Sequence, residues 1–186
     1  MIRLVILLLT LILPIPRPVY AADSQQEQKQ LRELEEVLKE DIPHVMCVGS
    51  NITTGGQPSI NAYAKLASHG FRSVLNLRTA QEGVSLEEEK NAVEKAGLRY
   101  INIPVISRAP TPEQVTEFLM VVKNKSNQPM LVHCASANRV GAFWMIYRVL
   151  EQDWPQEKAL EEATRIGLTS PALKEFALNY IASHQE

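Results

Sequence analysis

The residues with the clearest chemical potential form one short run, from His133 to Arg139. It reads His-Cys-Ala-Ser-Ala-Asn-Arg, so four small or polar residues separate Cys134 from Arg139. A thiolate is a strong nucleophile, and loop amides, a helix start and a nearby guanidinium all favour it over the thiol. The same groups bind oxyanions such as phosphate or sulfate. The run therefore predicts an anion-binding site around a nucleophilic cysteine.

Each residue of this run has an expected role. Cys134 is the predicted nucleophile, and Arg139 is expected to hold the oxyanion with its planar fork of donors. We expect His133 to order the loop by hydrogen bonding behind it, and assign it no proton transfer. The substrate-binding backbone amides are predicted to be those of Ala135, Ser136, Ala137, Asn138 and Arg139.

The flanking residues predict a buried strand, a tight loop and a helix. Residues 130–132 form a short apolar run that leads into His133, and residues 140–151 have apolar positions at helical spacing. Gly141 is expected to let the helix lie close to the strand. Cys134 then stands at the carboxyl end of the strand, which is where open α/β sheets bind their ligands.

The rest of the chain predicts an α/β fold. Strands are predicted at 45–48, 71–77, 100–103 and 130–133, and helices at 60–70, 86–96, 112–124, 140–151, 156–166 and 172–183. Residues 49–58 are predicted as turns. Ser59 is predicted to cap the helix at 60–70, and Thr111-Pro112-Glu113-Gln114 has the pattern of a capping box that opens the helix at 112–124. Strands that alternate with helices indicate crossover connections. We therefore expect a mostly parallel four- to five-stranded sheet flanked by helices.

The N-terminus has the pattern of a secretory signal peptide. A basic start is followed by an apolar run over 4–13, by prolines, and by the small-x-small pattern Val19-Tyr20-Ala21, which predicts a cut after Ala21 or Ala22. An uncleaved membrane anchor is the alternative, but this run is far shorter than the ~20 residues that span a bilayer. We predict a signal peptide at 1–21, a polar helical spacer at 22–41 and a domain at 42–186. The mature protein is then periplasmic or secreted, with no stable membrane anchor.

Composition excludes several classes of function. The 186 residues suit one domain with a real core, and a net charge of -2 gives no reason to expect nucleic-acid binding. The spacing of His44, His69 and His184 does not suit a metal. Two cysteines are too few for a disulfide scaffold. Cys47 is either a small residue on the first strand or a redox partner of Cys134.

Several motifs together resemble a known family. The run from His133 to Gly141 is similar to the signature loop of cysteine-dependent tyrosine and dual-specificity phosphatases. Three upstream segments narrow the resemblance to a bacterial phosphatase-like domain also found fused to beta-lactamase-like hydrolases. These segments are Gly55-Gly56-Gln57-Pro58, Gly70-Phe71-Arg72-Ser73-Val74-Leu75-Asn76-Leu77-Arg78 and Ile103-Pro104-Val105.

The resemblance implies a phosphatase-like fold and a covalent mechanism. Cys134 would form a phosphocysteine intermediate, and Arg139 would bind the phosphoryl oxygens. A phosphorylated protein or a small phosphoester is the implied partner, and the resemblance implies no metal or organic cofactor.

Three departures from the family pattern matter. The phosphatase loop has five residues between cysteine and arginine, whereas four are present here. Val140 replaces the usual Ser or Thr, which helps the thiolate to leave. The loop at 104–111 lacks the aspartate that is expected as general acid, and Glu113 and Asp153 are the candidates to replace it. Because general acid catalysis contributes about 10²–10⁴-fold, turnover is expected to be slow on alkyl esters.

Two other readings remain open. Rhodanese-type sulfurtransferases resemble this loop in length, carry a persulfide on the cysteine and need no aspartate, so a sulfane-sulfur donor is the alternative substrate. A catalytically silent oxyanion-binding module is the other reading.

Three further residues are candidates for the site. Arg78 and Glu82 either line the site or pair with each other on the surface, and Gln57 lies in a turn near the expected pocket.

Overall fold

The structure is a computed structural model that describes residues 18–185. Most of the predicted signal peptide, at 1–17, lies outside the described residues, together with residue 186. The first described element is helix α1 (Pro18–Leu38), and the predicted cut after Ala21 or Ala22 falls within it.

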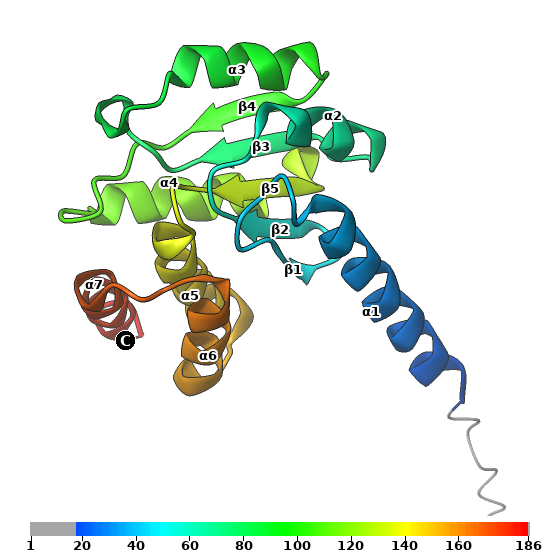
Figure 1. Ribbon diagram of the computed structural model, residues 1–186. Coiled ribbons are helices and arrows are strands. Elements are labelled where there is room, and N and C mark those ends of the chain that lie inside the picture. Colours follow the sequence, from blue (N-terminus) through cyan, green and yellow to red (C-terminus); the bar gives the residue numbers. More distant parts are fainter. Residues whose placement is uncertain (1–17, 186) are drawn as a thin grey trace, which may run out of the picture.

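A five-stranded sheet organises the fold (Figure 1). Its strands are β1 (Met46–Gly49), β2 (Ile52–Gly55), β3 (Ser73–Asn76), β4 (Arg99–Asn102) and β5 (Met130–His133). They lie in the order β1-β2-β5-β3-β4, and only β1 is antiparallel to its neighbour. The predicted mostly parallel α/β sheet is therefore confirmed.

Helices connect and follow the strands. They are α2 (Ile60–Ser68), α3 (Leu86–Lys95), α4 (Pro112–Lys123), α5 (Asn138–Gln152), α6 (Gln156–Ile166) and α7 (Pro171–Ala182), with 3-10 turns η1 (Ala80–Glu82) and η2 (Lys125–Asn127). The predicted capping box opens α4, because Thr111 Oγ1 accepts from Gln114 N and Gln114 Oε1 accepts from Thr111 N. Ser59 differs from expectation, since its hydroxyl donates to Asp41 and does not cap α2.

Strand β2 was not predicted, since residues 49–58 read as turns. Ile52, Thr53 and Thr54 are β-branched, which favours a strand, but the segment is too short to show a hydrophobic period. All of β2 is buried, and it pairs in parallel with β5 in the register Gly55↔His133. It thereby places its carboxyl end beside the cysteine loop.

The sheet is buried on both faces. Along β5, Leu131 packs into a cluster with the C-terminal end of α1, α2 and α3, whereas Met130 and Val132 pack with α4, α5, α6 and α7. The two clusters hold β5 rigidly at the centre of the molecule. The residue that follows β5 is therefore firmly positioned.

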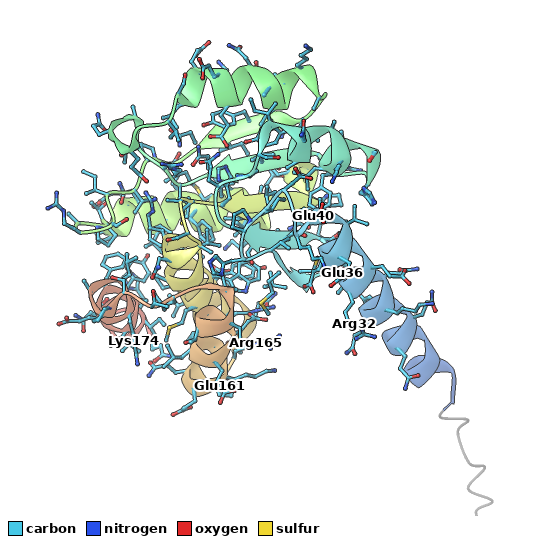
Figure 2. The ribbon with its side chains drawn as sticks, in the orientation of Figure 1. Arg32, Glu36, Glu40, Glu161, Arg165 and Lys174 are labelled. Carbon is cyan, nitrogen blue, oxygen red and sulfur yellow. The ribbon has the colours of Figure 1, made fainter. Side chains whose placement is uncertain are left out.

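Helix α1 joins the domain at its C-terminal end. Leu38 and Ile42 are fully buried, and Glu35 Oε1 accepts a 2.7 Å hydrogen bond from Cys47 N on β1. The other end extends away from the sheet (Figure 1). Figure 2 shows charged side chains, Arg32 and Glu36 among them, projecting from α1. Within residues 18–185, no helix is long and apolar enough to cross a membrane.

Candidate active site

Cys134 directly follows β5, at the carboxyl edge of the sheet. Its backbone N–H donates to Gly55 O at 3.4 Å, and the residue is 1% exposed. The following Ala135 and Ser136 are exposed. Gln57 N donates to Ala135 O at 3.1 Å, so the turn after β2 holds the loop from one side. The predicted placement of the thiol at a strand end agrees with this geometry.

The loop reaches α5 through a residue with left-handed backbone. Ala137 has φ 61 and ψ 0, a conformation that costs non-glycine residues roughly 1–2 kcal/mol. Gly167 lies directly against it, because a Cβ built on Gly167 would stand 3.0 Å from Ala137 Cβ and 3.0 Å from Ser136 O. The loop conformation thus depends on a glycine more than twenty residues downstream.

Arg139 lies in the first turn of α5 and is 3% exposed. Its Nη1 donates to Leu77 O at 3.0 Å and to Val105 O at 2.8 Å, which are carbonyls from the loops after β3 and β4. Nη1 and Nη2 also form a bidentate pair with Glu82, at 2.6 and 2.7 Å. The guanidinium is therefore fixed from two neighbouring loops.

The Nε edge of this guanidinium remains available for a ligand. Within the part of the chain that the structure describes, Nε of Arg139 donates to no acceptor. Burial lowers the pKa of Arg139, but hydrogen bonding to Glu82 and the nearby charges of Cys134 and Glu82 outweigh this and raise it. Arg139 thus stays charged beside the sulfur, with donors left for an oxyanion.

Glu82 is the structural partner of two arginines. It pairs with Arg139 and also with Arg78, whose Nε lies 3.2 Å from Oε2. Burial raises the pKa of Glu82, but the bonds from Arg139 and Thr79 and both guanidinium charges lower it to about 2. Both sequence readings hold in part, because Glu82 binds Arg78 and also reaches the site. Glu82 is ionised at neutral pH and cannot donate a proton.

Asn138 turns its side chain away from the loop. Its Oδ1 accepts from Thr169 N and Ser170 N, both at 2.8 Å, and its Nδ2 donates to Thr169 Oγ1 at 3.1 Å. Only its backbone amide is available to the predicted binding site. The side chain instead joins the α6–α7 connection to the start of α5 by hydrogen bonds.

Gly141 allows α5 to lie close to the end of α6. A Cβ there would stand 2.7 Å from Ala163 O and 3.0 Å from Leu168 Cβ. The expectation that Gly141 brings α5 close to the strand was therefore wrong. Its close approach is to the end of α6.

His133 faces a buried acid that the sequence reading missed. Its ring is fully buried, and Nε2 lies 3.0 Å from Oε1 of Glu89 on α3. Neither ring nitrogen of His133 has a hydrogen-bond partner among the described residues, so the expected hydrogen bond behind the loop is not present, and the close approach to Glu89 takes its place. Glu89 was read as part of a charged helix. Its place on the apolar stripe, three after Leu86 and four before Val93, was the available signal.

Glu89 joins the loops around the nucleophile into one network. It accepts from Tyr63 Oη at 2.6 Å, from Asn76 Nδ2 at 2.6 Å and from Gln57 Nε2 at 3.1 Å. Burial raises the pKa of Glu89, but His133 and these donors outweigh it and hold the pKa below its ordinary value. Gln57 also accepts from Arg78 Nη1 at 2.6 Å. This turn residue therefore braces the loop from behind.

Neither substitute acid lies at the sulfur. Glu113 is exposed in the first turn of α4, where hydrogen bonding to Thr111 lowers its pKa, and no described hydrogen bond joins it to the site. Asp153 caps the far end of the 15-residue helix α5, about 24 Å from Ala137 at 1.5 Å per residue. Asp153 is therefore excluded as the general acid.

The two cysteines lie too far apart to form a disulfide. Cys47 pairs with Thr53, and Thr53 pairs with Leu131, three residues before Cys134. Two strand spacings and three residues along the strand separate the cysteines by about 14 Å, against a limit of about 7 Å between Cα atoms. Both thiols are free, and burial raises the pKa of Cys47 to about 11. The reading of Cys47 as a packing residue fits this geometry.

Residues 27–177 match the family described as DSP-PTPase phosphatase fused to NAD+ kinase. The chain belongs to this phosphatase family. The match covers nearly the whole described domain and starts within the segment predicted as a spacer. The resemblance to cysteine-dependent phosphatases drawn from the motifs is confirmed.

Curated relatives extend the predicted link to beta-lactamase-like hydrolases. The chain is 26% identical over 110 residues to the beta-lactamase hydrolase-like protein of Xylella fastidiosa, covering 58% of this chain and 25% of the relative. The corresponding protein of Agrobacterium fabrum is 26% identical over 107 residues, covering 56% and 25%. The chain thus spans about a quarter of the length of these relatives.

Solved structures share the fold. A DUF442 phosphatase from Shewanella putrefaciens CN-32 has a TM-score of 0.68 and 22% identity, with 82% of this chain and 97% of that chain covered. The core catalytic domain of the PP-IP phosphatase SIW14 from S. cerevisiae has a TM-score of 0.66 and 20% identity, covering 75% and 87%. TpbA from P. aeruginosa, in complex with pTyr, has a TM-score of 0.61 and 19% identity, covering 76% and 85%. The phosphatase-like fold is confirmed.

Proposed function

We propose that this chain is a cysteine-dependent phosphatase that cleaves aryl phosphoesters, on a protein or a small molecule. The observation that supports this most directly is the uncommitted Nε edge of the buried Arg139 beside the Cys134 sulfur. A guanidinium edge of this kind holds two oxygens of a phosphoryl group. The loop amides from Ala135 to Arg139 are the proposed remainder of the cradle.

The proposed reaction has two steps. The Cys134 thiolate attacks phosphorus, the phosphorus–oxygen ester bond breaks, and the aryl oxide leaves and takes a proton from water. Water then attacks the phosphocysteine, which releases inorganic phosphate and regenerates the thiolate. Arg139 offsets the charge on the phosphoryl oxygens in both steps. No metal or organic cofactor takes part.

The lack of a general acid near Cys134 limits which leaving groups the substrate can carry. Glu82 is ionised and bound to Arg139, Glu89 is buried behind β5, and the loop at 103–111 has no acid. An alkyl oxide leaves slowly without a proton, whereas an aryl oxide leaves readily. This difference favours aryl phosphates.

The test is hydrolysis of para-nitrophenyl phosphate by the mature chain. We expect turnover that orthovanadate inhibits and that Cys134→Ser abolishes, while Cys47→Ser, the matched control thiol, retains it. Turnover that persists in Cys134→Ser would exclude the cysteine mechanism.

Sulfur transfer is the second candidate, and two observations favour it: the four-residue loop and the missing acid. In this reaction the Cys134 thiolate attacks the outer sulfur of thiosulfate and releases sulfite. Cyanide then removes that sulfur as thiocyanate. Thiocyanate formation without aryl phosphate turnover would replace the phosphatase proposal. Neither activity, with phosphate binding that is lost in Arg139→Ala, would indicate an oxyanion-binding module.

We also propose export to the periplasm or outside the cell, on the strength of the leader pattern at 1–21. Purification of the tagged protein from the periplasmic fraction, followed by N-terminal sequencing, tests this proposal. A mature start after Ala21 or Ala22 is expected. An intact N-terminus in the membrane fraction would favour the anchor reading.

A further inference from the structure

We propose a second anion-binding subsite beside the cysteine loop, which selects aryl phosphates that carry another acidic group. It rests on the proposed function, because the first phosphoryl group occupies the loop. It adds a substrate class that the cysteine and arginine alone do not define.

The subsite is a cavity of about 470 Å³ at the carboxyl edge of the sheet. It is formed by the loops after β3 and β4, and its lining residues are Thr79, Gln81, Glu82, Ile106, Ser107 and Arg108. These loops are the same ones whose carbonyls, on Leu77 and Val105, hold Arg139. The cavity therefore adjoins the arginine of the phosphoryl site and is large enough for part of a ligand.

The lining favours a negative charge. Glu82 is the acid in it, but both of its oxygens already accept bonds from Arg139, Arg78 and Thr79. Arg108 is exposed and makes no ion pair or side-chain hydrogen bond with the residues that the structure describes. Since Arg78 and Arg139 both pair with Glu82, the cavity and its immediate surroundings hold three guanidinium groups and one carboxylate. An incoming carboxylate or phosphate would offset this local excess.

Ile106 indicates what joins the two anionic groups. It is 54% exposed and lines the cavity, and the carbonyl of the preceding residue, Val105, accepts from Arg139. An exposed aliphatic side chain at the mouth of a site suits the face of an aromatic ring. The missing general acid independently favours an aryl leaving group. Together with the excess of positive charge, these preferences indicate an aryl phosphate with a second acidic substituent.

The experiment compares aryl phosphates that differ in one charge. Phenyl phosphates with a carboxymethyl group at the meta or para position are paired with the corresponding ethyl compounds, whose leaving groups are closely similar. We expect kcat/KM to favour at least one carboxymethyl compound by about three- to tenfold at low salt, and less at high salt. In Arg108→Gln the ratio should fall to about one. Arg72→Gln removes the same charge from an exposed site before β3 and should preserve the ratio.

Binding of the corresponding benzylphosphonates, measured by calorimetry, separates this inference from the proposed function. These compounds are not hydrolysed, so their affinities report on Arg108 whether or not the chain turns over phosphate. Tighter binding of a carboxymethyl compound that disappears in Arg108→Gln supports the subsite, even without turnover. Equal affinities, or a preference that Arg108→Gln retains, would overturn it.

Discussion

At the scale of single residues, the site depends on how Arg139 divides its donors. The Nη groups bind Glu82 and two loop carbonyls, while Nε remains available. The first set fixes the guanidinium plane, and the second provides the proposed contact with substrate. A lysine ammonium cannot serve both roles, because it is a point charge without a fork.

Arg139→Lys should therefore lower kcat/KM for an aryl phosphate by about 10²–10³-fold, the usual effect of removing an oxyanion donor. Steady-state kinetics on the purified variant measure this. Arg148→Lys is the matched control, because Arg148 is also buried and paired with a carboxylate, that of Glu162, away from the loop. It should lose stability and retain kcat/KM. Equal losses in both variants would mean that Arg139 is only structural.

Glu82 should make stability depend on pH. Its pKa falls from an ordinary 4.5 to about 2 in the folded protein, so folding favours the ionised form. This contribution is complete above the unfolded value of 4.5 and is lost as pH falls toward about 2. The side chain is 25% exposed, which reduces the contribution through solvent screening.

Glu82→Gln should accordingly lower the free energy of unfolding by about 2 kcal/mol at neutral pH. Urea denaturation of both proteins across the acidic range measures the difference, which should shrink as the wild-type carboxylate becomes protonated. The lowered pKa of Glu89 acts in the same direction, but it is common to both proteins and cancels. A difference that is constant with pH would contradict the role given to Glu82.

At the scale of elements, the connection from α6 to α7 supports the loop from outside. The Asn138 side chain binds Thr169 and Ser170, and Gly167 lies against Ala137. Gly167 has φ +139, which L-residues rarely adopt, and a Cβ there would meet two loop atoms at 3.0 Å. The connection therefore holds Ala137 in its left-handed conformation.

Gly167→Ala should disturb the loop and lower both stability and turnover. We expect a loss of about 1–3 kcal/mol in unfolding free energy and a clear fall in kcat/KM, measured by denaturation and kinetics. Gly97→Ala provides the control, since Gly97 has φ +84 and open space around its Cβ position. It should lose stability from backbone strain alone and keep its turnover. Normal kcat/KM in Gly167→Ala would show that the loop does not depend on this contact.

Local sequence signals predicted most elements but not the strand beside the nucleophile. The capping box at Thr111 and the apolar run at Met130–His133 mark α4 and β5, because each depends on neighbouring residues. Strand β2 depends on pairing with β5, and its sequence of Ile-Thr-Thr-Gly has no pattern of its own. Tertiary pairing decided its conformation.

At the scale of the whole molecule, the same contrast between local sequence signals and tertiary contacts explains which parts of the site could be predicted. The nucleophile and its arginine are five residues apart, so the sequence identified them directly. Glu82 and Glu89 reach Arg139 and His133 only because β3, β5 and α3 meet at one edge, and no local pattern encodes that meeting. The family resemblance predicted the fold, whereas the positions of these carboxylates required the structure.

The sheet geometry also predicts the redox state of the cysteines. With β2 between β1 and β5, Cys47 and Cys134 cannot approach within disulfide distance while the sheet is intact. The mature protein, purified without reductant and then denatured, should show two free thiols on titration. No free thiols, with a monomeric mass, would contradict the strand order.

The most direct test of the central claim is a rapid-quench experiment with an aryl phosphate, followed by mass spectrometry of the intact protein and its peptides. If Cys134 is the nucleophile held beside Arg139, one phosphoryl group should appear on the peptide containing Cys134, and it should decay as inorganic phosphate is released. The label should be absent in Cys134→Ser and present in Cys47→Ser. Steady hydrolysis without a phosphorylated Cys134, or a phosphoryl group on another residue, would contradict the account.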